Sequence, residues 1–249
     1  MGFPSLGTDR VIVALDLSDR ERVLKLVELL SPYVRFFKVG SQLFTRYGPS
    51  IIHELRALGI EIFLDLKFHD IPRTVYEAVA AASELGIRWV SLHAAGGREM
   101  IRAGVQAVEG SFTQVLAVTV LTSLGQKEWE ELGWAGTVEN RVMAWARLAS
   151  EAGVHGIICS PWELEGVRAV VGKDLWMVCP GIRDLGWEKG DQKRFCSARE
   201  AFERGATHIV IGRPILEADN PARVVEELTA HVLFPASGSG AEARLERGC

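Results

Sequence analysis

Eight short runs of apolar and β-branched residues recur along this chain, and a segment with helical periodicity follows each of them. Runs of this kind are typical of the buried strands of a parallel sheet. Eight such alternations in 249 residues predict an α/β fold, a single-domain (β/α)8 TIM barrel. An open doubly wound sheet usually has fewer strands, and no GxGxxG motif follows the first run. The expected strands are residues 11–15, 36–39, 62–66, 89–93, 115–121, 156–159, 175–179 and 208–211.

Capping and proline signals place helices between these runs. Ser18 or Asp19 can cap the first helix, because both side chains accept hydrogen bonds from backbone N–H groups at a helix start. Pro49, Pro72 and Pro221 each fit the first turn of a later helix, where a missing N–H group costs nothing. The helices therefore follow the strands in the order that a barrel requires.

Two segments are longer than the connections of a regular barrel. Residues 123–138 form either an active-site lid or a surface excursion that its two tryptophans pack down. We expect residues 183–197 to form a lid. Residues 1–234 then make up the barrel, and residues 235–249, rich in Ala, Ser, Gly and Arg, a disordered C-terminal tail.

Composition and charge argue against several classes of protein. The net charge is −4 at pH 7 without a block of Lys or Arg, so we expect no nucleic-acid partner. No apolar run approaches the roughly 20 residues of a membrane-spanning helix, and the first ten residues lack a signal pattern. We therefore expect a cytoplasmic protein without a membrane partner. Neither CxxC pairing nor zinc spacing occurs among the cysteines, which are Cys159, Cys179, Cys196 and Cys249.

Charged residues stand at the ends of several expected strands. Residues two apart in a strand point to the same face, so Asp65 and Lys67 lie side by side at the end of the third strand. Asp16, Lys38 and His93 end the first, second and fourth strands. Barrel enzymes place catalytic groups at these carboxyl ends. Because buried charges must be paired or functional, we interpret the set as catalytic rather than as isolated ion pairs.

Two residues near this set have alternative interpretations. Asp70 precedes Pro72 and is either a helix cap or a further member of the charged set. His93 is either a hydrogen-bonded interior histidine or a functional group. The sequence leaves both alternatives open.

A second constellation follows the last two expected strands. Gly181 and Arg183 follow the seventh strand, and Gly212 and Arg213 follow the eighth. Many barrels bind phosphate at these two loops. Glycine lets backbone N–H groups approach phosphate oxygens, and the arginine fork matches a phosphate bidentately. The pattern favours a phosphorylated substrate over a pair of structural turns.

These blocks together resemble the orotidine 5′-phosphate decarboxylase family. Residues 65–72, DLKFHDIP, are similar to its signature, although a D-x-K-x-x-D run alone belongs to a wider superfamily. The resemblance extends from about Val11 to His231. Further blocks match in order: Ala14-Leu15-Asp16, Lys38-Val39-Gly40, His93-Ala94-Ala95-Gly96-Gly97, Leu121-Thr122-Ser123, Pro180-Gly181-Ile182-Arg183, Gly190-Asp191-Gln192-Lys193-Arg194 and Gly212-Arg213-Pro214.

The resemblance implies decarboxylation of orotidine 5′-monophosphate to UMP, the final step of de novo pyrimidine biosynthesis, without a metal or cofactor. It also implies a homodimer in which Asp70 and Thr74 reach the partner's site. Lys67 is the implied proton donor to C6 of the pyrimidine, within an alternating network of Lys38, Asp65, Lys67 and Asp70. The implied substrate contacts are Asp16 and Lys38 at the ribose, Thr122 at the pyrimidine, and Arg183, Gln192, Gly212 and Arg213 at the phosphate.

The chain departs from the family's pattern in two places. Family members often have Asn where this chain has Arg73, which alters the surroundings of Thr74. Residues 183–190 are unusual in detail, so the apolar contacts of the expected lid do not carry over.

The sequence leaves two alternative functions open. Keto-gulonate-phosphate decarboxylases and hexulose-phosphate synthases share the D-x-K-x-x-D run but work through Mg²⁺, which requires carboxylate ligands. Those relatives carry an acid where this chain has Lys38. A non-catalytic barrel that only binds a phosphorylated metabolite would typically have lost a member of the charged network, and all four members are present.

Overall fold

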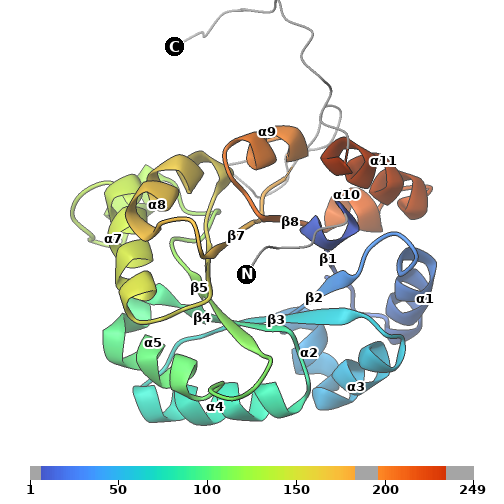
Figure 1. Cartoon of the computed structure of the whole chain (residues 1–249), viewed down its shortest axis with the longest axis horizontal. Helices are drawn as coiled ribbons and strands as arrows, with labels where there is room; N and C mark the ends of the chain where they lie inside the picture. The colour runs from blue at the N-terminus through green and yellow to red at the C-terminus, as the bar shows by residue number, and fades with distance from the viewer. Residues whose placement is uncertain (1–6, 183–195, 234–249) are drawn as a thin grey trace, which may run out of the picture.

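The computed structural model describes residues 7–182 and 196–233 of the chain. Within these residues eight parallel strands form a closed barrel in sequence order, and helices surround it (Figure 1). The predicted TIM barrel is thus confirmed. The strands are β1 (Val11–Ala14), β2 (Phe36–Gly40), β3 (Glu61–Phe68), β4 (Trp89–His93), β5 (Gln114–Val118), β6 (Gly156–Ile158), β7 (Trp176–Cys179) and β8 (His208–Ile211).

The helices begin where the capping and proline signals predict. The Asp19 carboxylate accepts a hydrogen bond from the Arg22 N–H at 2.8 Å, which caps α1. Pro49, Pro72 and Pro221 are the first residues of α3, α4 and α11. The helices are η1 (Gly7–Arg10), α1 (Arg20–Leu30), α2 (Ser41–Tyr47), α3 (Pro49–Ala57), α4 (Pro72–Glu84), η2 (Ala94–Gly96), α5 (Gly97–Gln106), α6 (Gln126–Glu131), α7 (Val138–Glu151), η3 (Pro161–Glu163), α8 (Leu164–Val171), α9 (Ala198–Glu203), α10 (Arg213–Leu216) and α11 (Pro221–Leu233).

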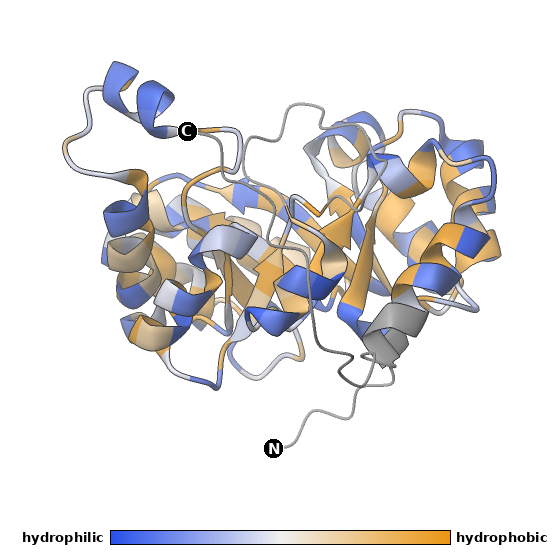
Figure 2. Ribbon diagram, turned by 90° about the horizontal axis from the view of Figure 1, so that it is seen from above, coloured by the Kyte–Doolittle hydropathy of each residue, from blue (hydrophilic) through white to orange (hydrophobic). Residues whose placement is uncertain are grey.

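Alternation along the strands divides the core into two layers. On β1, Val11 and Val13 face the helices, whereas Ile12 and Ala14 face the barrel interior. The outer layer is the larger one, and Figure 2 shows apolar strands and inner helix faces with hydrophilic outer faces. The inner layer contains Ile12, Ala14, Phe36, Phe63, Trp89, Leu116, Val118, Ile158, Val178 and Val210.

Two strand ends differ from the prediction in ways that matter for the site. β3 continues to Phe68 rather than ending at Leu66, so Lys67 belongs to the strand itself. β5 ends at Val118, three residues earlier than predicted, because the chain bends at Val120. The residues after β5 therefore form a loop over the barrel rather than an extension of the sheet.

Residues 123–138 form an excursion whose tryptophans are packed together. Trp129 of α6 is fully buried, and its ring lies 4.2 Å from that of Trp134 and 6.0 Å from that of Trp145 on α7. This packing supports the surface excursion held down by tryptophans.

Some predictions fall outside the described residues. These are the tail over residues 235–249 and residues 183–195 of the lid expected over residues 183–197. In the part of the chain that the structure describes, the cysteines Cys159, Cys179 and Cys196 are buried. No helix among the described residues has the length and apolar character needed to span a bilayer.

Candidate active site

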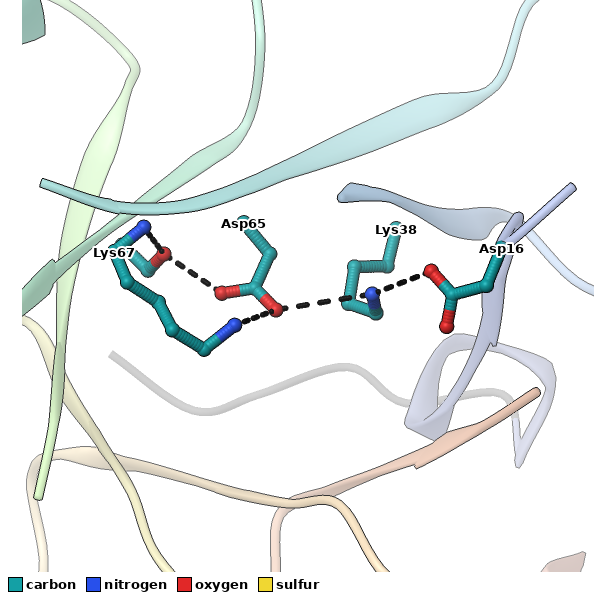
Figure 3. A network of polar contacts seen from close by, with 5 residues as sticks. Asp16, Lys38, Asp65 and Lys67 are labelled. Atoms are coloured by element: carbon teal, nitrogen blue, oxygen red, sulfur yellow. Dashed lines mark hydrogen bonds and ion pairs between the residues drawn. The ribbon is translucent and has the colours of Figure 1, made fainter. Parts of the chain in front are cut away.

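Four charged side chains form an alternating row across the carboxyl-end mouth of the barrel (Figure 3). They come from the loop after β1, from β2 and from β3. The Lys38 Nζ lies 3.0 Å from the Asp16 carboxylate and 3.7 Å from that of Asp65. The Lys67 Nζ lies 2.7 Å from the same Asp65 oxygen, Oδ2. Asp65 thus bridges the two ammonium groups, and each of its neighbours carries the opposite charge.

Asp65 is the buried centre of this row, with a residue exposure of 7%. Burial alone would raise the pKa of its carboxyl group. The ammonium groups of Lys38 and Lys67, together with hydrogen bonds from Lys67 and Ser91, outweigh burial and hold the pKa below the usual value. Asp65 is therefore ionised at neutral pH, and its negative charge lies between the ammonium groups of the two lysines.

The backbone at Lys67 has an unusual conformation. Its φ is +51°, the sole positive value for a non-glycine residue among the described residues. From Leu64 to Phe68, β3 advances four residues while β4 advances two, so the ladder contains a bulge. Such a conformation costs about 1–3 kcal/mol and persists only where the surroundings impose it. Bulges next to active sites re-aim side chains, and this one directs Lys67 toward Asp65.

A cavity of about 550 Å³ opens beside the charged row. Asp16, Lys38, Asp65 and Lys67 line it, as do Thr122, Gly181, Gly212 and Arg213. The structure therefore brings both predicted constellations to one cavity. It can hold a substrate with one end at the lysine–aspartate row and an anionic end at the loops after β7 and β8.

The end of the cavity at the loops after β7 and β8, where the sequence predicts phosphate binding, combines a helix start with glycines. α10 begins at Arg213, directly after Gly212. Gly181 has a φ of +84°, a left-handed conformation that a side chain would strain. Small residues at these positions leave backbone N–H groups accessible, and the arginine adds positive charge beside them. Arg183 and Gln192, the other predicted phosphate contacts, lie outside the described residues.

Asp70 and Thr74 lie apart from the cavity of their own chain. Both are exposed, and neither lines the cavity. The Asp70 carboxylate accepts a hydrogen bond from the Ile71 N–H at 2.7 Å, but Ile71 occupies the N-cap position of α4. The interpretation of Asp70 as the helix cap is therefore wrong, since its carboxylate binds no N–H within the helix.

His93 ends β4 at the edge of the site. Its Nδ1 accepts a hydrogen bond from the Ala95 N–H at 3.2 Å, and its ring stacks on His69 with centroids 5.3 Å apart. Burial, followed by the charges of His69 and Lys67, lowers the pKa of His93 to about 4. At neutral pH it is an uncharged, hydrogen-bonded ring, which agrees with the first of the two interpretations.

Three residues of the site were missed from the sequence. Gln42 and Glu217 line the cavity but carry no motif. Ser91 is fully buried on β4, and its Oγ lies 2.7 Å from Asp65 Oδ1 and 2.9 Å from the Lys67 backbone nitrogen. The available signal was a small polar residue on the inward face of an apolar strand, between Trp89 and His93.

Fold and site together have the form of a TIM-barrel enzyme, with paired lysines and aspartates at one end of the cavity and glycines with an arginine at the other. Comparison with known proteins agrees. Residues 9–228 match the model of the orotidine 5′-phosphate decarboxylase / HUMPS family. This chain belongs to that family.

Individual relatives cover nearly the whole chain. The orotidine 5′-phosphate decarboxylase of Nitrosococcus oceani is 45% identical over 225 residues, 90% of this chain and 97% of that protein. The enzyme of the same name from Methylacidiphilum infernorum is 47% identical over 217 residues, 87% of this chain and 94% of that one. A crystal structure of orotidine 5′-phosphate decarboxylase from Lactobacillus acidophilus aligns with a TM-score of 0.79 at 35% identity, covering 90% of this chain and 99% of that one.

Proposed function

We propose that this chain decarboxylates orotidine 5′-monophosphate to UMP, without a metal or cofactor, in pyrimidine biosynthesis. The observation that carries the proposal is the Lys67 ammonium, held 2.7 Å from Asp65 in the cavity that Gly212 and Arg213 also line. Family membership and the names of the curated relatives support the same reaction. We assign the barrel to residues 1–234 and expect the cytoplasm as its compartment.

The reaction needs a fixed positive charge. When the bond between C6 and the carboxylate breaks, CO₂ leaves and the electron pair stays on C6 in the plane of the ring, where the π-system cannot delocalise it. The Lys67 ammonium stabilises this pair electrostatically and then transfers a proton from Nζ to C6, and solvent returns the proton to the lysine. The Asp65 carboxylate accepts a hydrogen bond from the Lys67 ammonium at 2.7 Å and fixes its position.

The remaining cavity residues orient the substrate. Asp16 and Lys38 bind the ribose hydroxyls, and Thr122 contacts the pyrimidine. Gly212 and Arg213 bind the phosphate, together with Arg183 and Gln192, which we assign from the family resemblance. Binding energy from the phosphate is remote from C6, and it holds the base against Lys67.

Lys38 distinguishes this reaction from that of the magnesium-dependent relatives. Its ammonium lies between the carboxylates of Asp16 and Asp65, at 3.0 and 3.7 Å. A divalent cation that used both carboxylates would have to displace this charge, and like charges repel. The ion pairs therefore favour a reaction that proceeds without Mg²⁺.

A spectrophotometric assay tests the function directly. The purified chain should consume orotidine 5′-monophosphate, seen as loss of its absorbance, at the same rate with and without EDTA. Complete loss of turnover in EDTA would favour a metal-dependent relative. Absence of turnover in both conditions, with the nucleotide still bound, would favour a non-catalytic barrel.

We also propose a homodimer in which Asp70 and Thr74 complete the partner's site. Both lie exposed on the single chain, next to two exposed apolar side chains, Ile71 at 66% and Tyr76 at 40%. Exposed apolar residues beside charges are typical of an interface. A symmetric dimer would place Asp70 of one subunit near Lys67 of the other.

Mixing two inactive variants tests this arrangement. Lys67→Ala and Asp70→Asn homodimers should each be nearly inactive. After the subunits are exchanged, each mixed dimer has one site with both substitutions and one intact site. Activity should then return to about a quarter of wild type for random mixing. No recovery, with exchange verified by mass, would contradict the contribution of Asp70 across the interface.

A further inference from the structure

We infer that Ser91 is a positioning residue of the decarboxylation, because one buried hydroxyl fixes both the Asp65 carboxylate and the bulged backbone that carries Lys67. The inference rests on the proposed function for its kinetic test. Ser91 lies on β4, and both of its partners lie on β3.

The hydrogen-bond roles of Ser91 follow from the chemistry of its partners. The Lys67 N–H can only donate, so the Ser91 Oγ accepts from it at 2.9 Å. An ionised carboxylate can only accept, so the single hydroxyl proton of Ser91 goes to Asp65 Oδ1 at 2.7 Å. Because a hydroxyl has one proton, neither bond can change direction while the other persists. The two bonds fix each other.

These bonds decide which carboxylate oxygen faces the lysines. Ser91 holds Oδ1, and Oδ2 is left to meet Lys67 at 2.7 Å and Lys38 at 3.7 Å. Rotation of the carboxylate moves both oxygens together, so it would break the contact with Ser91 as well as the lysine contacts. Ser91 thus sets the orientation of the group that positions the proton donor.

The second hydrogen bond, from the Lys67 N–H to the Ser91 Oγ, lies where the backbone pairing of β3 with β4 is interrupted. Pairing between β3 and β4 shifts between Leu64 and Phe68, and Lys67 lies within this interval with a φ of +51°. A backbone N–H buried without a partner is costly, so the bulge needs an acceptor at this point. The Ser91 side chain supplies it from the opposite strand. Its loss should let the Lys67 backbone relax toward an ordinary strand conformation.

The pKa of Asp65 provides a second, independent measurement. The hydrogen bond from Ser91 is one of the interactions that hold the pKa of Asp65 below its usual value. Without that donor the folded-state pKa of Asp65 rises. If ionised Asp65 is required for turnover, the acid limb of kcat/KM then moves to higher pH.

Kinetics of Ser91→Ala test the inference, with Thr113→Val as the matched control. Thr113 is 2% exposed and donates to the Ile87 carbonyl at 2.7 Å, just before β5 and away from the cavity. We expect Ser91→Ala to lower kcat about 100-fold, since small displacements of reacting groups have effects of this size. The KM should change by less than about threefold, because the phosphate contacts are intact. Thr113→Val should keep the wild-type kcat.

Two further substitutions at the same position keep the test valid if Ser91→Ala does not fold. Ser91→Thr retains the hydroxyl and should recover most of the kcat that Ser91→Ala loses, whereas Ser91→Cys, a weak donor, should not. A wild-type kcat and acid limb in folded Ser91→Ala, or in folded Ser91→Cys where Ser91→Ala does not fold, would overturn the inference.

A crystal structure of Ser91→Ala, or of Ser91→Cys, gives a readout that does not depend on the reaction. We expect the Asp65 carboxylate to rotate or the Lys67 φ to leave the left-handed region. If both remain as they are here, the positioning role is wrong even in an active enzyme. Failure of the proposed function would instead appear as an inactive wild type, which the same assay measures in parallel.

Discussion

The two mouths of the barrel differ in chemistry, although the same strands line both. On β2, β3 and β4 the inward side chains are large rings at the amino-end mouth, and two residues further along, at the carboxyl-end mouth, they are polar or charged. The successive inward pairs are Phe36 and Lys38 on β2, Phe63 and Asp65 on β3, and Trp89 and Ser91 on β4. On these three strands the amino end packs, and the carboxyl end carries polar groups of the site.

The aromatic mouth is held by ring contacts and a shared acceptor. The Trp89 and Trp176 indole N–H groups both donate to the Gln114 side-chain oxygen, at 3.0 and 2.9 Å. Phe36 stacks on Trp89 with centroids 4.8 Å apart, and the His208 ring meets Trp89 edge-on at 4.7 Å. We interpret this cluster as the rigid base on which the charged row is built, since barrel enzymes concentrate stability at this face.

Removal of the ammonium at the carboxyl-end mouth should have the largest effect. We expect Lys67→Ala to lower kcat by about 10⁴-fold or more, because both the electrostatic stabilisation and the proton donor are lost. The thermal midpoint should stay near that of wild type, since Lys67 is partly exposed at 38%. Steady-state kinetics and a thermal melt measure both quantities. A kcat near wild type would contradict the assignment of Lys67.

Removal of a ring at the amino-end mouth should lower the stability and leave the kcat nearly unchanged. Trp89 is 1% exposed, and Trp89→Ala should lower the free energy of unfolding by about 3–5 kcal/mol. The kcat of the folded protein should stay within about threefold of wild type, because the ring lies outside the cavity of the charged row. Trp162→Ala is the matched control, since Trp162 is 53% exposed and should cost far less. Urea unfolding supplies the energies, and a loss of kcat without loss of stability would break the division between the mouths.

The histidine of the aromatic mouth gives a pH signature. Burial, followed by the charge of Arg10, lowers the pKa of His208 to about 3. The folded state therefore keeps His208 neutral while the unfolded chain protonates near pH 6.5, so its contribution to stability is complete above that pH and is lost as the pH falls. Between pH 7 and pH 4 the loss is about 3 kcal/mol.

Substitution of this histidine should flatten the acid side of the stability profile. His208→Phe keeps an aromatic ring among Trp89 and Trp176 and removes the titrating group. Urea unfolding at pH 7, 5.5 and 4 should show a smaller loss than in wild type, whereas His53→Phe, at an exposed histidine, should not change the profile. An unchanged profile in His208→Phe would mean that another group dominates acid unfolding.

The division between the mouths was partly visible in the sequence. The period of two in the third strand placed Asp65 and Lys67 on the same face. The eight apolar runs that alternate with helices predicted the closed barrel, because burial on both sides of a parallel sheet leaves a strong apolar pattern. The glycines after β7 and β8 predicted a phosphate-binding end, since backbone access requires residues without side chains, and both glycines line the cavity of the charged row.

What the sequence concealed depends on contacts between strands. The bulge at Lys67 arises from the register of β3 against β4, which no local pattern encodes. Ser91 contacts Asp65 across 26 positions of the chain, and a lone serine in an apolar strand is equally compatible with simple burial. The cap alternative for Asp70 failed for a related reason, because Asp is common at helix caps but the structure places the N-cap one residue later, at Ile71.

The charged mouth can itself be divided into a chemical end and a binding end, and Arg213 tests that division. Arg213→Ala should raise KM about 100-fold by removing a charge beside the substrate phosphate, with kcat lowered by less than about tenfold. Arg199→Ala, at a surface arginine of α9 that pairs with Glu203, is the matched control and should leave both constants unchanged. Steady-state kinetics with orotidine 5′-monophosphate separate the two effects. An interaction with the phosphate is remote from C6 and should act first on substrate binding, and therefore on KM. If Arg213→Ala instead lowered kcat as strongly as Lys67→Ala and left KM unchanged, the phosphate would have to bind elsewhere.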